Sequence, residues 1–134
     1  MTTCGLWPGR SQLVVVVADD DGKAGPPLLV ARTDDARWGL LEHLDATQGL
    51  DCELVVPEDL LKSDSIANLA LRRGLAVWIA PQRLVEAIRV VAGLATGPPR
   101  RSAAMLARLP LSFALRAQLR RLVGPADDRQ IPLL

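Results

Sequence analysis

Four carboxylates of this sequence follow two strand-like segments, and they could bind a metal ion if the fold brought them together. Asp19 and Asp20 follow the apolar run 12–18, Glu58 follows the run 51–56, and Asp64 lies a few residues further on. Converging carboxylates can hold Mg²⁺ and activate water. Each also has a structural interpretation, because Asp favours tight turns and acidic groups stabilise the first turn of a helix. We expect the structural roles.

Other reactive residue types lack the partners that catalysis or metal binding would need. The one histidine, His43, has no Ser or Cys nucleophile that the sequence can place beside it, so we expect it to be solvated. Cys4 and Cys52 have no Cys-x-x-Cys spacing, which predicts buried reduced thiols and neither a zinc site nor a disulfide. No glycine-rich phosphate-binding loop occurs. We therefore expect no cofactor and no metal.

Positive charge is concentrated towards the end of the chain. Residues 1–96 carry nine Lys or Arg against 13 acidic residues, a net charge of −4, whereas residues 97–134 carry seven Arg against two Asp, a net charge of +5. Clustered arginines can contact phosphates, and the alternative is a solvated helix face or pairing with the acidic body. The candidate nucleic-acid-binding residues are Arg100, Arg101, Arg108, Arg116, Arg120 and Arg121.

The composition is that of one ordinary globular domain. The chain has 134 residues, of which 49% are hydrophobic and 23% are charged. Aromatic residues make up 3%, which disfavours binding of single strands by base stacking. No apolar run approaches the roughly 18 residues of a membrane helix, and the start of the chain does not resemble a signal peptide. We expect a cytoplasmic protein without membrane contact.

Apolar periodicity and turn residues predict three strands followed by alternating helices and strands, that is β-β-β-α-β-α-β-α. The crossovers between the later strands should be parallel and right-handed, with helices on both faces of a mixed five-stranded sheet. The three tryptophans should lie in or near the core. The expected strands are 3–7, 12–18, 27–32, 51–56 and 75–80, and the expected helices are 34–47, 57–73, 81–95, 101–109 and 110–123.

We divide the chain into a domain of residues 1–96 and a basic helical extension of residues 97–134. The second helix of the extension, 110–123, would carry a stripe of leucines. Such a stripe predicts packing on the same domain, on a partner, or on a second copy in a homodimer. The residues of this candidate oligomer interface are Leu111, Leu115, Leu119 and Leu122.

The order of elements resembles the ribonuclease-H-like superfamily, and within it the N-terminal RuvC-like domain of DEDD (Piv-type) transposases. The likeness covers about residues 3–109 and rests on order and spacing. The matching segments are Gly5-Leu-Trp-Pro-Gly-Arg10, Leu13-Val-Val-Val-Val17, Val55-Val-Pro-Glu58, Ala80-Pro-Gln-Arg-Leu-Val85 and Arg100-Arg-Ser-Ala-Ala104.

The resemblance implies a degenerate active site. The family holds two Mg²⁺ ions between three or four carboxylates, but Trp7 stands in place of the first-strand Asp, and Ser102 and Ala103 stand in place of the later pair. Only Glu58 remains near its expected place. The resemblance thus implies a non-catalytic binding or scaffolding domain derived from a mobile element. The alternatives are a divergent Mg²⁺-dependent nuclease or recombinase fragment using Asp19, Asp20, Glu58 and Asp64, or an accessory DNA-binding protein that uses the arginines.

Overall fold

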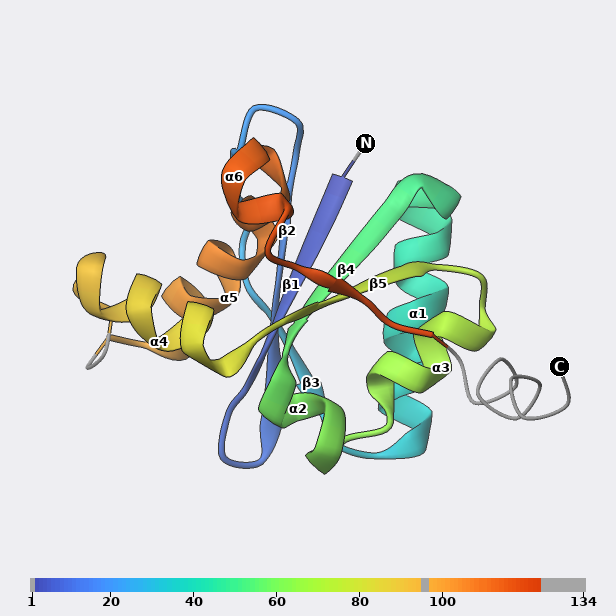
Figure 1. The fold of residues 1–134 in the computed structure, drawn as a ribbon. Helices are drawn as coiled ribbons and strands as arrows, with labels where there is room; N and C mark the ends of the chain where they lie inside the picture. The colour runs from blue at the N-terminus through green and yellow to red at the C-terminus, as the bar shows by residue number, and fades with distance from the viewer. Residues whose placement is uncertain (1, 95–96, 124–134) are drawn as a thin grey trace, which may run out of the picture.

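The computed structural model describes residues 2–94 and 97–123, which form one mixed sheet with helices on both faces (Figure 1). The strand order is β3-β2-β1-β4-β5-β6. Strand β2 pairs antiparallel with both β1 and β3, β4 and β5 run parallel to β1, and β6 is an antiparallel edge strand. The strands are β1 (Thr2–Pro8), β2 (Gln12–Ala18), β3 (Leu28–Ala31), β4 (Cys52–Pro57), β5 (Ala76–Ala80) and β6 (Arg120–Arg121).

One face of the sheet is covered by α1 (Asp34–Gln48) and α3 (Ile66–Arg72). Alternation along the central strand β1 points Cys4 and Leu6 into the core on this side. Helix α1 begins at Thr33, whose hydroxyl oxygen accepts a hydrogen bond of 3.3 Å from the Ala36 N–H. The predicted β-β-β-α-β-α-β-α order is confirmed, with β6 as an additional strand.

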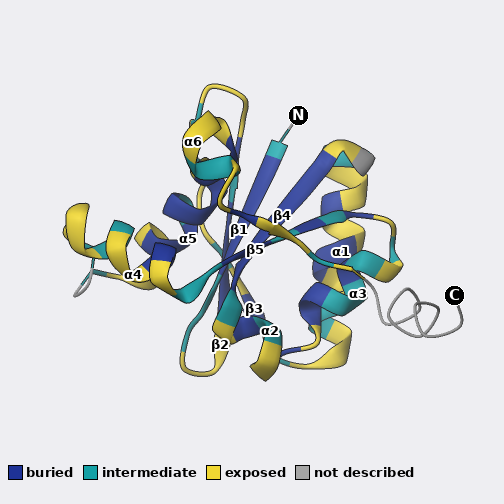
Figure 2. Cartoon of the chain, in the orientation of Figure 1, coloured by how far each residue is buried: buried dark blue, intermediate teal, exposed yellow. Residues whose placement is uncertain are grey.

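The opposite face is covered by α4 (Gln82–Val91) and α5 (Pro99–Arg108), and α5 lies directly on β1 and β2. The approach is so close that only glycine fits at position 5. A Cβ atom there would collide with the Ala103 carbonyl oxygen and lie 2.6 Å from the Ala107 nitrogen. Because α5 is buried against the sheet (Figure 2), the described part of the predicted extension, residues 97–123, is continuous with the rest of the domain.

The predicted helix 57–73 is two helices, α2 (Glu58–Ser63) and α3. The chain is extended at Asp64, with φ −146° and ψ 148°. The Asp64 carboxylate accepts a hydrogen bond of 2.9 Å from the Ile66 N–H and so caps the beginning of α3. The interruption arises because Asp64 also pairs with two distant arginines, which sequence periodicity cannot show.

The predicted helix 110–123 is wrong. The chain instead forms a 3-10 turn (Leu109–Leu111), the short helix α6 (Phe113–Arg116) and the strand β6. Strand formation is favoured because the outer edge of β5 offers unpaired backbone groups, and the Leu122 N–H donates to the Val77 carbonyl oxygen at 2.9 Å.

The four leucines assigned to an oligomer interface therefore form no stripe. Leu119 is 8% exposed in the core beneath α4 and α5, and Leu122 packs on the core of the other face. Leu115 packs at the edge of the core beneath α4 and α5, and Leu111 is 45% exposed. The homodimer stays a prediction, and the continuous leucine surface that was expected to form its interface is not present in the described part of the chain. Among the described residues no helix is long and apolar enough to cross a membrane.

Candidate functional site

Trp7 lies near the carboxyl end of β1, on the face covered by α4 and α5. Its half-buried indole packs on the core formed by these helices, and the Arg89 guanidinium carbon of α4 lies 4.7 Å from the ring centroid. This distance is within the range of a cation–π interaction. Trp7 is thus part of the packing between the sheet and α4.

Glu58 follows β4 and caps α4. One carboxylate oxygen, Oε1, accepts a hydrogen bond of 3.1 Å from the Gln82 N–H at the beginning of α4, where Pro81 offers no capping side chain. The other oxygen, Oε2, lies 3.5 Å from Arg120 Nη2. Glu58 and Trp7 therefore contact α4 at points seven residues apart, which is about 10 Å along a helix axis.

The aspartates at the end of β2 lie at the other end of the sheet. Ala18, the last residue of β2, pairs with Thr3 at the beginning of β1, whereas Glu58 follows the end of the parallel strand β4. Asp19 Oδ1 accepts hydrogen bonds from the Asp21 N–H at 3.0 Å and from the Lys23 N–H at 2.9 Å. Asp19 thus has the predicted role of a turn residue.

Asp64 is buried between two arginines. Its carboxylate accepts hydrogen bonds from Arg37 Nε at 2.8 Å and from Arg32 Nε at 2.9 Å. Burial raises the pKa of Asp64, but the hydrogen bonds from Arg37, the Ile66 N–H and Arg32 together outweigh this effect, so that the pKa is lowered. The Asp64 carboxylate is an ion-pair partner that ties α1 and the end of β3 to the turn before α3.

The structure does not gather Asp19, Asp20, Glu58 and Asp64, the carboxylates named for the nuclease alternative, into one group within the described residues. Within residues 2–94 and 97–123, no group of three or more His, Cys, Asp or Glu side chains could hold a metal ion. The physical reason is the antiparallel turn between β1 and β2, which places Asp19 and Asp20 at the end of the sheet opposite Glu58.

Three of the six predicted phosphate-binding arginines contact the sheet from the C-terminal segment. Arg116 and Arg121 lie 5.0 and 5.3 Å from the Trp78 ring centroid. The Trp78 indole N–H donates to Glu53 Oε2 at 2.7 Å, and Arg116 Nη2 lies 3.4 Å from the same oxygen. Together with the Arg120–Glu58 pair, these contacts hold α6 and β6 against β4 and β5.

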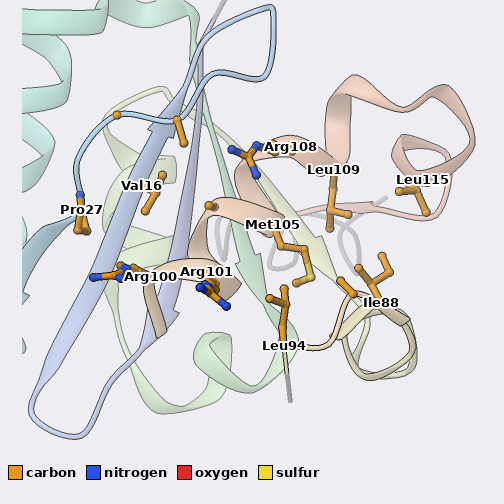
Figure 3. A pocket seen from close by; sticks show the side chains of 14 residues that line it. Val16, Pro27, Ile88, Leu94, Arg100, Arg101, Met105, Arg108, Leu109 and Leu115 are labelled. Atoms are coloured by element: carbon orange, nitrogen blue, oxygen red, sulfur yellow. The ribbon is translucent and has the colours of Figure 1, made fainter. Parts of the chain in front are cut away.

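The other three arginines, Arg100, Arg101 and Arg108, are exposed on α5 and line a groove of about 610 Å³. Arg108 Nε donates to the Gly22 carbonyl oxygen at 2.8 Å. Figure 3 shows the side chains of Met105 and Leu109 in this groove, with Val16 and Pro27 on one side and Ile88, Leu94 and Leu115 on the other. Apolar groups dominate the lining.

The remaining candidates have structural roles or none. Cys4 and Cys52 are buried free thiols, as predicted, and burial raises the pKa of both. His43 is exposed on α1, as expected. Sequence reasoning missed Glu53 and Arg89. A carboxylate such as Glu53 within an apolar strand must find a buried partner, which was the available signal, whereas nothing in the sequence marks Arg89 as the partner of an indole.

The strand order, the directions of the strands and the placement of helices on both faces define a ribonuclease-H-like α/β fold. Among solved structures, the chain is similar to RuvC of Thermus thermophilus, with 16% sequence identity and a TM-score of 0.58 over 91% of this chain and 100% of that chain. It is likewise similar to T. thermophilus RuvC in complex with Holliday junction substrate, with 18% identity and a TM-score of 0.56 over 91% of this chain and 99% of that chain. Comparisons with known protein families and with curated proteins gave no match.

Proposed function

We propose that this chain is a ribonuclease-H-like domain, derived from a mobile-element protein, that binds a partner and does not cleave nucleic acid. The observation that carries the proposal is the Trp7 indole near the end of β1, packed against α4 and α5 beneath Arg89. An indole cannot bind a hard cation, which requires oxygen ligands.

The residue that resembles the remaining family carboxylate supports the same conclusion. Both oxygens of Glu58 are engaged, one with the backbone of α4 and the other with Arg120. Ser102 and Ala103, which stand in place of the later pair of acids, are buried on α5. The role of Glu58 in capping α4 accounts for a carboxylate at this position, so no catalytic role is needed to explain it.

The proposal is tested with purified protein and fluorescently labelled substrates in 10 mM Mg²⁺ or Mn²⁺. The substrates are a DNA duplex, a four-way junction and an RNA–DNA hybrid. We expect no cleavage above the protein-free control, and none with the Glu58→Ala variant. Metal-dependent cleavage that Glu58→Ala abolishes, while its circular dichroism stays native, would overturn the proposal.

Nucleic acid is a second candidate partner, favoured by Arg100, Arg101 and Arg108, which meet no carboxylate within 4 Å in the described part of the chain. The similarity to a RuvC structure solved with a Holliday junction substrate supports it. Three phosphate contacts would lower the affinity for duplex DNA about 40-fold between 50 and 200 mM salt. Fluorescence anisotropy measures this slope, and an affinity that does not change with salt rejects this candidate.

A further inference from the structure

The groove on α5 is open along the outer face of the helix. Met105 of α5 lies at the floor of the groove, with Pro27 of the β2–β3 connection on one side and Ile88 of α4 on the other (Figure 3). Ala104, next to Met105 on α5, also lines the groove, as do Ala24, Gly25 and Ala92. The small side chain of Ala104 allows another backbone to approach closely. A groove with an apolar floor is the kind of surface that accepts the apolar face of an amphipathic helix.

The charges at the rim of the groove are all positive. Arg101 and Arg108 are seven residues apart on α5, which corresponds to about 10 Å, or two helical turns. Arg100 lies beside Arg101 in the first turn of α5, which holds no acidic residue. Positive side chains there oppose the helix dipole. Arg100 and Arg101 therefore do not stabilise the helix that carries them, and none of the three arginines forms an ion pair within the described residues.

We propose that this groove binds an acidic amphipathic helix of a partner protein. The apolar side chains of the partner helix would contact Ala104 and Met105, and two of its carboxylates, two helical turns apart, would pair with Arg101 and Arg108. This inference goes beyond the proposed function, because it names a partner class that needs neither nucleic acid nor the Trp7 region. The apolar floor favours a protein segment over nucleic acid. No aromatic residue lines the groove, and aromatic rings are what single strands stack on.

The test uses the full chain and a fluorescein-labelled synthetic helical peptide of 18 residues. The peptide carries leucines along one face and two glutamates seven positions apart at the edge of that face. We expect binding by fluorescence anisotropy, and binding at least about tenfold weaker for a scrambled peptide and for a peptide with both glutamates replaced by lysine.

Two variants separate charge from the apolar floor. Arg101→Glu should weaken peptide binding at least about tenfold, whereas Arg83→Glu is the matched control, because Arg83 is an exposed arginine on α4 that does not line the groove. Ala104→Gln changes no charge but fills the floor, and it should weaken peptide binding without affecting binding of a DNA duplex. Circular dichroism checks that each variant is folded.

Three results would overturn the inference. The first is equal affinity for the designed and the scrambled peptide. The second is an equal loss of peptide affinity in Arg83→Glu and Arg101→Glu, which would show that only net charge matters. The third is DNA binding that Arg101→Glu abolishes and Ala104→Gln leaves unchanged, in a protein that does not bind the peptide. That last result assigns the arginines to nucleic acid, while the cleavage assay decides the proposed function independently.

Discussion

Replacement of Gly5 by alanine tests whether the close contact between α5 and the centre of the sheet holds the domain together. The new methyl group would collide with the Ala103 carbonyl oxygen and lie 2.6 Å from the Ala107 nitrogen, whereas ordinary contacts begin near 3.4 Å. Both atoms belong to the backbone of α5, so no side-chain rotation can relieve the overlap. The whole helix must move away from β1.

The cost follows from what α5 buries. A withdrawal of about 1 Å weakens each dispersion contact of the helix with the sheet by a quarter to a half. Ala103, Leu106 and Ala107 are fully buried in that contact. Overpacking of a core costs about 1–3 kcal/mol, and because the obstacle is rigid backbone we expect a loss of about 3 kcal/mol. This is a large part of the roughly 5–15 kcal/mol by which a domain is stable.

Urea unfolding followed by circular dichroism measures the change in the free energy of unfolding. Gly39→Ala is the matched control, because Gly39 is exposed in α1 and a Cβ atom there meets nothing within 4 Å. Alanine favours a helix over glycine, so this control should be more stable by about 0.5–1 kcal/mol. If Gly5→Ala unfolds within about 0.5 kcal/mol of the unmodified protein, the packing of α5 on Gly5 is not as described.

Three further predictions concern other parts of the domain. Asp64→Asn should lose about 3 kcal/mol at pH 7 by breaking a buried ion pair. Because the pKa of Asp64 is lowered in the folded state, the stabilisation from its carboxylate is present above the unfolded pKa of about 3.9 and disappears as the pH falls through the folded pKa. The free energies of unfolding of the variant and the parent, measured in urea, should therefore become equal in acid. A difference that stays constant down to pH 2 contradicts this prediction. Cys4 and Cys52, whose pKa values are raised by burial, should react with Ellman's reagent at pH 8 only after unfolding, and rapid labelling of the native protein would show that they are accessible. Arg100→Glu should stabilise α5 by about 0.3–1 kcal/mol through the helix dipole and raise the melting temperature by about 1–4 °C, whereas a lower melting temperature would mean that Arg100 has a stabilising contact.

Elements with local causes could be predicted from the sequence, and they agree with the structure. The apolar run of β2 and the cap residue Thr33 of α1 act within a few residues of themselves. Pro81, which precedes α4, acts equally locally. Elements that depend on distant partners were mispredicted. A helix across Asp64 fits the local pattern, but Arg32 and Arg37 hold its carboxylate where the chain must be extended.

Tryptophan placement shows the same division. Trp38 was expected in or near the core because it shares a helical stripe with Leu41 and Leu44, and both leucines are fully buried. Trp38 itself is 38% exposed and lies 5.9 Å from the Arg73 guanidinium carbon. An apolar stripe in the sequence predicts which side of a helix faces the core. How much of that side is covered depends on the neighbouring elements, which only the tertiary structure shows.

By itself, the sequence determined the order of the elements, the presence of a tryptophan and not an acidic residue at position 7, and the accumulation of arginines after residue 97. Only the tertiary structure decided that Glu58 caps α4, that Asp19 lies at the far end of the sheet, and that three of the arginines border an apolar groove. The physical reason is range. Backbone preferences, capping and turn chemistry act over a few residues, whereas strand pairing, ion pairs and grooves depend on residues that the chain brings together from tens of positions apart.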